Sequence, residues 1–96
     1  MIIRIVRMSF QPNKVNAFID IFNRSMVKIR KSEGCAHLSL HQDLKASNVY
    51  YTISHWESPD HLEQYRKSDL FKNTWGMVKP LFDEQPVAYS LNKQTP

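Results

Sequence analysis

Residues 48–72 read NVYYTISHWESPDHLEQYRKSDLFK, and this stretch encodes a strand followed by two helix starts. Tyr50 to Trp56 is rich in β-branched and aromatic residues, a composition typical of strands. Ser58-Pro59-Asp60 then supplies an N-cap hydroxyl, a proline suited to the first helical turn, and a carboxylate near the positive end of the helix dipole. The stretch therefore predicts a helix from Pro59 to about Lys67 and a second helix that begins at the next such signal, Ser68-Asp69.

The first third of the chain predicts a strand and a long helix. Ile2 to Phe10 carries apolar residues at both parities, which is typical of a strand with neither face fully solvated. From Lys14 to about Lys31 the apolar residues recur at steps of three and four, as on one face of a helix. Asn13 is the expected cap of this helix and Gly34 its expected end. The apolar stripe consists of Val15, Phe18, Ile19, Phe22, Met26 and Ile29.

The remaining segments complete a recognisable order of elements. Ala36 to Asp43 alternates leucines with polar residues, and the short link Leu44 to Ser47 suits an antiparallel hairpin into the strand Val49 to Trp56. Pro86 to Leu91 is a last strand. The order strand, helix, strand, strand, helix pair, strand predicts an α+β fold of the ferredoxin-like βαββαβ type. We expect a four-stranded antiparallel sheet with helices on one face.

Length and composition narrow the class of protein. A chain of 96 residues buries enough surface for one domain, so we expect residues 1–96 to form a single domain with 92–96 as a polar tail. The net charge of +4 fits either solubility or attraction of an anionic substrate. The basic residues form no nucleic-acid motif, and no apolar run is long enough to cross a bilayer. Together with the single cysteine, Cys35, this predicts a cytoplasmic protein that binds neither nucleic acid nor membrane.

The sheet face opposite the helices needs a cover. The strands carry apolar or aromatic residues at both parities, including Tyr50 and Tyr51 side by side. A second copy of the chain is the simplest cover, because a two-fold operation buries the same patch on each partner. We therefore expect a homodimer.

The sequence predicts no metal site and no nucleotide cofactor. His37 and His41 would lie on one strand roughly 13 Å apart, too far to share a metal, and the other two histidines fall on different elements. Gly34 and Gly76 are the only glycines, so no glycine-rich loop is available to hold a phosphate.

The face on which each hairpin residue lies depends on the strand register. If paired residue numbers add up to an odd value of about 91, the histidines of the second strand share a face with the inner residues of the third. That polar set either lines a ligand cavity or forms a water-filled seam between subunits. Its members are His37, Ser39, His41, Tyr50, Thr52, Ser54 and Trp56, while Leu38, Leu40, Val49, Tyr51, Ile53 and His55 form the other set.

Two motifs resemble the antibiotic biosynthesis monooxygenase family. They are the step from strand to helix at Trp56-Glu57-Ser58 and the turn Ser68-Asp69-Leu70-Phe71-Lys72, and the resemblance extends from the strand at Ile2 to the strand at Tyr89. It implies a dimeric α+β barrel and a cofactor-independent monooxygenase acting on a small phenolic or quinol-like aromatic substrate. Because this superfamily hosts several functions, the alternatives are a non-catalytic ligand-binding or stress-associated dimer and an isomerase of a small carbonyl compound.

The same resemblance implies a substrate pocket with aromatic walls. Family members that oxygenate polycyclic aromatic substrates carry a tryptophan at the position of Trp56, which is otherwise interpreted as a structural anchor of the strand end. Tyr65, Trp75 and Thr52 complete the expected substrate-binding set. Tyr65 and Trp75 also belong to apolar helical stripes, so a role in packing is the alternative for both.

Three residues are candidates for catalysis. His41 or His61 would act as the base that deprotonates the substrate, since imidazole titrates near neutral pH. Arg7 would hold the resulting anion, or else would be a sheet residue paired with a carboxylate. In the haem-degrading branch of the family, a histidine ligates iron at the position of Trp75, and Arg7 and Tyr65 also differ from that branch. We therefore expect that haem is not bound.

Overall fold

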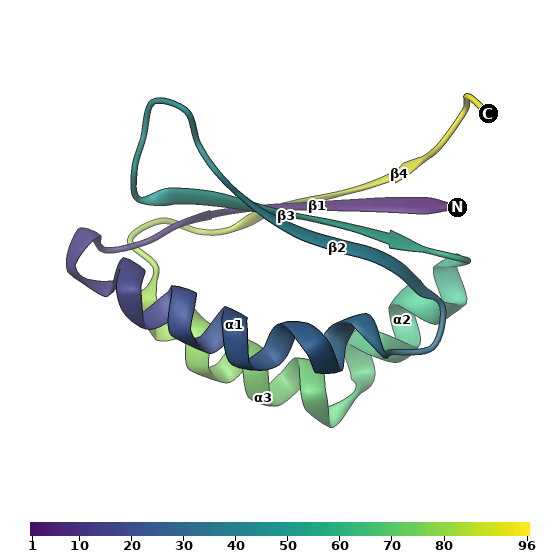
Figure 1. The fold of residues 1–96 in the computed structure, drawn as a ribbon, viewed down its shortest axis with the longest axis horizontal. Coiled ribbons are helices and arrows are strands. Elements are labelled where there is room, and N and C mark those ends of the chain that lie inside the picture. The colour runs from purple at the N-terminus through teal and green to yellow at the C-terminus, as the bar shows by residue number, and fades with distance from the viewer.

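The computed structural model describes residues 1–96, and its elements follow the predicted order (Figure 1). Four antiparallel strands form one sheet in the order β2-β3-β1-β4. All helices lie on one side of this sheet, which confirms the predicted ferredoxin-like α+β arrangement. The elements are β1 (Ile2–Ser9), the 3-10 turn η1 (Pro12–Lys14), α1 (Val15–Arg30), β2 (Cys35–Gln42), β3 (Val49–Trp56), α2 (Pro59–Lys67), α3 (Asp69–Val78), the 3-10 turn η2 (Lys79–Leu81) and β4 (Val87–Asn92).

The two serine caps predicted from the sequence are present. The Ser58 hydroxyl accepts a hydrogen bond from the backbone N–H of His61 at 3.2 Å, and the Ser68 hydroxyl accepts one from Phe71 at 3.2 Å. Each bond satisfies an N–H group that the first turn of a helix leaves free. Two short helices therefore begin where the local sequence specifies them.

The ends of α1 differ from the prediction. Asn13 lies inside η1, and the N-cap of α1 is Lys14, which makes no side-chain cap, so the prediction that Asn13 caps this helix is wrong. A proline at the start of η1 favours this tight turn before the helix. The helix ends at Arg30, and Gly34 instead forms the turn into β2 with φ at +80°. A Cβ atom at Gly34 would overlap the His61 ring. Glycine is therefore required here both by the positive φ and by the lack of space for a side chain.

The core lies between the sheet and the helices. Phe10 and Phe18 stack with ring centroids 4.1 Å apart, and both are almost inaccessible to solvent. A smaller group forms where Leu62 of α2 packs against Ile2 and Trp56 of the sheet. The main group comprises Met8, Phe10, Phe18, Ile21, Phe22, Ile29, Leu38, Tyr50 and Val78.

The register of the β2–β3 hairpin is not the predicted one. Gln42 lies opposite Tyr50 and His37 opposite His55, so paired numbers add up to an even value, with an irregularity between Cys35 and His37. The Asp43 carboxylate accepts hydrogen bonds from the backbone N–H groups of Lys45 and Ala46 at 3.0 and 2.9 Å, so Asp43 belongs to the turn. The strand β2 therefore ends at Gln42, one residue before the predicted end at Asp43.

This register moves the leucines of β2 to the face under the helices. Leu38 shares that face with Ser54 and is buried there, as its apolar side chain requires. The helix-covered face comprises Ile2, Arg4, Val6, Met8, Leu38, Leu40, Tyr50, Thr52, Ser54, Trp56, Ala88 and Ser90. The helix-free face comprises Ile3, Ile5, Arg7, His37, Ser39, His41, Tyr51, Ile53, His55, Val87, Tyr89 and Leu91.

Candidate ligand cavity

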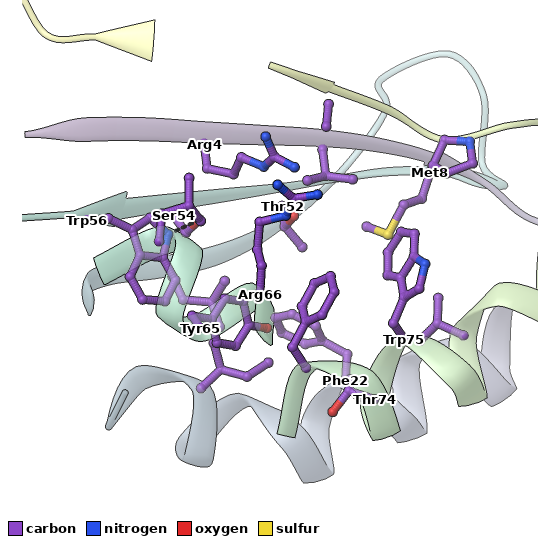
Figure 2. Close-up of a pocket in the computed structure, with 18 of the residues that line it drawn as sticks. Arg4, Met8, Phe22, Thr52, Ser54, Trp56, Tyr65, Arg66, Thr74 and Trp75 are labelled. Carbon is purple, nitrogen blue, oxygen red and sulfur yellow. Dashed lines mark hydrogen bonds between the residues drawn. The ribbon is translucent and has the colours of Figure 1, made fainter. Parts of the chain in front are cut away.

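A cavity of about 290 Å³ lies between the helix-covered face and the three helices (Figure 2). Thirteen of its nineteen lining residues are hydrophobic, so its walls are mainly apolar. An engineered apolar cavity of about 150 Å³ holds benzene, and small-molecule sites begin at about 300 Å³. The cavity therefore has the size for a ligand of about two aromatic rings.

Four aromatic side chains form a continuous row along the cavity, which we call the aromatic row. Trp56 stacks on Tyr65 with centroids 4.8 Å apart, and Tyr65 meets Phe71 edge-on at 5.3 Å. Phe71 in turn lies nearly parallel to Trp75, with an interplanar angle of 9° and centroids 5.9 Å apart. Offset stacking and edge contacts are the favoured arrangements of aromatic rings, so the row is a rigid surface for a further ring.

Hydroxyl groups give the cavity a few polar points. The Trp56 indole N–H donates to the Ser54 hydroxyl at 2.9 Å, and both side chains are buried. This bond satisfies the indole and fixes its orientation. Thr52 from β3 and Thr74 from α3 add two more hydroxyls to the lining.

Two arginines bring positive charge to the same cavity. Arg4 extends from β1 and donates to the Ser90 hydroxyl at 2.8 Å, while Arg66 extends from α2 and pairs with Glu63 at 3.5 Å. Partial burial and, next, the Arg66 charge lower the pKa of Arg4, whereas Glu63 acts in the opposite direction. Both guanidinium groups stay charged because arginine does not lose its proton in proteins.

The cavity contains no side chain that acts as a base near neutral pH. Burial raises the pKa of Tyr65 to about 12, so its phenol stays neutral. No histidine, aspartate, glutamate or cysteine lines the walls. Elsewhere too, no group of three histidine, cysteine or acidic side chains gathers as metal ligands would.

The structure brings together all four residues that the sequence predicts for substrate binding. Thr52, Trp56, Tyr65 and Trp75 line the cavity, although they come from β3, α2 and α3. The two interpretations of Trp56 are compatible, because it is fully buried and also forms part of the cavity wall.

The three predicted catalytic residues lie outside the cavity. Arg7 is on the helix-free face and forms the carboxylate pair offered as its alternative, with Glu84 at 3.2 Å. His41 lies on the same face and shares a hydrogen bond of 2.8 Å with Ser39. His61 sits at the start of α2, where its Nδ1 atom is 2.7 Å from the Ser58 hydroxyl.

Arg4 and Arg66 line the cavity but are not among the site residues predicted from the sequence. Arg4 has the same parity in β1 as the inward-facing Val6 and Met8, and a charged residue at an inward parity is rarely buried without a reason. Arg66 follows Leu62 by one helical turn on α2 and so joins the face that meets the sheet. The parity of Arg4 was the available signal.

The fold and cavity together define a small ferredoxin-like α+β protein with an aromatic-walled pocket between sheet and helices. The chain belongs to the antibiotic biosynthesis monooxygenase family, whose model matches residues 1–75. This agrees with the resemblance seen in the Trp56-Glu57-Ser58 step.

Solved structures share the fold over the whole chain. A conserved protein from Methanosarcina mazei Go1 is 23% identical with a TM-score of 0.91, and the alignment covers 98% of this chain and 94% of that one. An antibiotic biosynthesis monooxygenase is 14% identical with a TM-score of 0.92, covering 99% and 100%. The Rv0793 protein of Mycobacterium tuberculosis is 17% identical with a TM-score of 0.91, covering 99% and 96%. No curated protein matches the sequence. None of the helices is both long and apolar enough to span a bilayer.

Proposed function

We propose that this protein is a cofactor-independent monooxygenase that acts on a small phenolic or quinol-like aromatic substrate in the cavity. The observation that carries the proposal is the aromatic row, which offers parallel and edge-on surfaces to a planar ring within a mainly apolar space. Membership of the monooxygenase family supports the type of reaction.

The proposed reaction needs no external reductant. A phenol with a free para position reacts with dioxygen to give a para-quinone and water. One oxygen atom enters the ring as the new carbonyl and the other leaves as water, and the substrate supplies all four electrons. The two hydrogen atoms of the water come from the phenol hydroxyl and the para carbon. The protein then has to bind the ring, favour its anion and exclude bulk water.

The lining of the cavity determines which group can remove the proton from the phenol. Because no histidine or carboxylate lies there, the substrate enters as an anion or passes its proton to water. The charges of Arg4 and Arg66 favour the anionic form of a phenol, since nearby positive charge lowers the pKa of an acid. His41 and His61 remain hypotheses that require a proton path from outside the cavity.

The missing base also favours a second candidate function. A protein that only binds an aromatic molecule needs apolar walls and a few polar points, and it needs no proton acceptor. The alternative is therefore a non-catalytic ligand-binding protein that uses the same cavity. An isomerase of a carbonyl compound is less well supported, because it requires a base beside the substrate.

Oxygen consumption separates these functions. We would screen phenols and quinols for substrate-dependent uptake of dioxygen, then compare Trp75→Ala with Met77→Ala, an exposed position on the same helix. We expect an active substrate, and a loss of about tenfold in kcat/KM for Trp75→Ala only, since aromatic contacts contribute about 0.5–1.5 kcal/mol beyond area burial. Ligands that raise the Tm without oxygen uptake would assign the protein to the binding function. Equal losses in both variants would remove Trp75 from the site.

We also propose that the protein works as a homodimer closed by the helix-free face. This face exposes Val87, Tyr89 and Leu91 on an edge strand, beside the isoleucines of the two central strands. Contiguous exposed apolar area of this kind is typical of subunit interfaces, and a two-fold axis would bury the same patch on each partner.

A further inference from the structure

Arg4 and Arg66 lie where the cavity meets the surface of the protein. Both residues line the cavity, and both also line an adjoining surface hollow between β1, β4 and α2. Figure 2 shows the two guanidinium groups above the aromatic side chains, with the Arg4 side chain lying along its strand and that of Arg66 rising from the helical side. The pair therefore lies between the cavity and this surface hollow.

The charges around this pair are not balanced within the chain. Arg66 has one carboxylate partner, Glu63, at 3.5 Å. Arg4 has no ion pair and is held only by the neutral hydroxyl of Ser90. The two guanidinium groups are close enough for Arg66 to disfavour the charge on Arg4. Because like charges repel and one carboxylate faces two guanidinium groups, the pair carries an excess positive charge that an anion would neutralise.

The other arginines of this protein are placed differently. Arg30 also lacks a carboxylate partner, but it donates to the Leu38 carbonyl at 2.9 and 3.3 Å and does not line the cavity. Arg7 pairs with Glu84 at 3.2 Å and Arg24 with Asp20 at 2.9 Å. An inward-facing arginine on a core strand without a carboxylate is therefore a specific feature of the cavity and is not general to the surface charge of the chain.

We propose that Arg4 and Arg66 together bind the oxyanion of an aromatic ligand whose rings lie on the aromatic row. The proposal rests on the function proposed above, because it uses the same cavity, and it restricts the substrate class to aromatic compounds with a carboxylate or an ionised phenol. Guanidinium groups present parallel N–H donors that match the two oxygens of a carboxylate. Two such groups from opposite walls fix the anion at the opening and direct the rings inward.

Binding of a matched set of bicyclic probes tests the charge requirement without any need for turnover. We would titrate the protein with 2-naphthoate, 2-naphthamide and ionised or neutral 2-naphthol, using calorimetry at low and high salt. The ring is the same in each probe, so differences report the oxyanion. We expect 2-naphthoate to bind about tenfold or more tightly than 2-naphthamide, as charge-assisted hydrogen bonds contribute about 1.5–3 kcal/mol. The naphthol arm, measured on both sides of its own pKa, distinguishes a phenolate from a carboxylate ligand.

Variants assign the preference to the pair. Arg4→Met and Arg66→Met keep an aliphatic stem and remove one charge, and Lys67→Met is the matched control because it removes a charge from the same helix at a more exposed position. We expect both arginine variants to lose the preference for 2-naphthoate and Lys67→Met to retain it. Arg4→Met should keep or raise the Tm, because it relieves repulsion and breaks no ion pair. A structural role for Arg4 would instead lower the Tm and leave the preference unchanged.

The binding results test the anion site, the monooxygenase reaction and the ligand cavity separately. Equal affinity for 2-naphthoate and 2-naphthamide would overturn the anion site while leaving the aromatic cavity and the proposed function intact. A charge preference that survives in both arginine variants would also overturn it. Preference for the anion with no oxygen uptake from any phenol would support the anion site and reject the monooxygenase. Failure of every naphthalene probe to bind would overturn this inference together with the ligand cavity.

Discussion

The two faces of the sheet use the same strands for different purposes. On the helix-covered face, Trp56 has 0% exposure and its indole is bonded to the buried Ser54 hydroxyl. On the helix-free face, Tyr89 is 56% exposed and Leu91 47%, although they lie on the same sheet. Alternation of side chains along each strand sends one residue into the cavity and its neighbour to the opposite surface. A single-residue shift in register would therefore exchange the candidate site with the candidate interface.

The polar groups differ between the faces as well. The cavity contains hydroxyls and two arginines, whereas histidines gather on the helix-free face. There the Ser39 hydroxyl lies 2.9 Å from His37 Nε2 and 2.8 Å from His41 Nε2. The His37 and His55 rings are 4.7 Å apart. The cavity thus carries the positive charge of two guanidinium groups, while the opposite face carries three imidazoles.

The largest effect should come from a charge at the centre of the helix-free face. Ile5 lies between Ile53 and Tyr89, so Ile5→Asp would place a carboxylate in the middle of the proposed interface. We expect the parent to have the mass of two chains at micromolar concentration and the variant that of one, as measured by light scattering, because an unpaired buried charge strongly disfavours association.

Val27→Asp is the matched control for this experiment. Val27 is 51% exposed on α1, on the helical side of the molecule, and should tolerate the charge without a change in mass. A parent with the mass of a single chain would reject the dimer, and dissociation caused equally by Val27→Asp would move the interface to the helices.

A smaller effect is expected for Trp56→Phe on the helix-covered face. The change leaves much of the apolar area but removes the bond to Ser54, so the free energy of unfolding should fall by about 1–2 kcal/mol. Tyr89→Phe on the opposite face should change it by less than about 0.5 kcal/mol. Chemical unfolding of both variants measures the contrast.

The same variant refines the role of Trp56 in the cavity. Loss of affinity for a phenolic ligand beyond the loss of stability would support the indole as part of the binding wall. A Trp56→Phe protein that melts far lower but binds the ligand like the parent would assign Trp56 to packing alone.

The contrast between the faces also explains what the sequence predicts well. The fold follows from local signals such as Ser58 and Ser68, whose hydroxyls need only a backbone N–H three residues away. The family pattern around Trp56 and the apolar helical stripes predict Trp56, Tyr65 and Trp75 as pocket residues, and all three line the cavity. Such features depend on neighbours in the chain, so their prediction does not require a known register.

Other features depend on pairing between distant segments, and the local sequence does not determine them. The side on which His41 lies is decided by the turn at Asp43, whose carboxylate bonds to two N–H groups and shifts the register by one residue. Arg4 and Arg7 differ in sequence by only three positions but lie on opposite faces, so that Arg4 lines the cavity and Arg7 pairs with Glu84. Composition alone cannot distinguish two arginines of one strand.

The smallest predicted effect is a pH dependence that belongs to the helix-free face. Burial first, then the neighbouring His37 and Lys93, lower the pKa of His55 below its usual value of about 6.5. The folded state therefore binds fewer protons than the unfolded chain between the lowered pKa and 6.5, so stability falls as the pH decreases through that window and is fully retained above it.

Thermal melting between pH 7.5 and pH 5 should show this fall in stability, and His55→Gln should reduce it. His37→Gln should reduce it less, because it removes a neighbouring group but leaves the burial of His55, which is the larger cause. An unchanged pH dependence in His55→Gln would mean that the titration arises elsewhere and that the histidines do not distinguish the two faces.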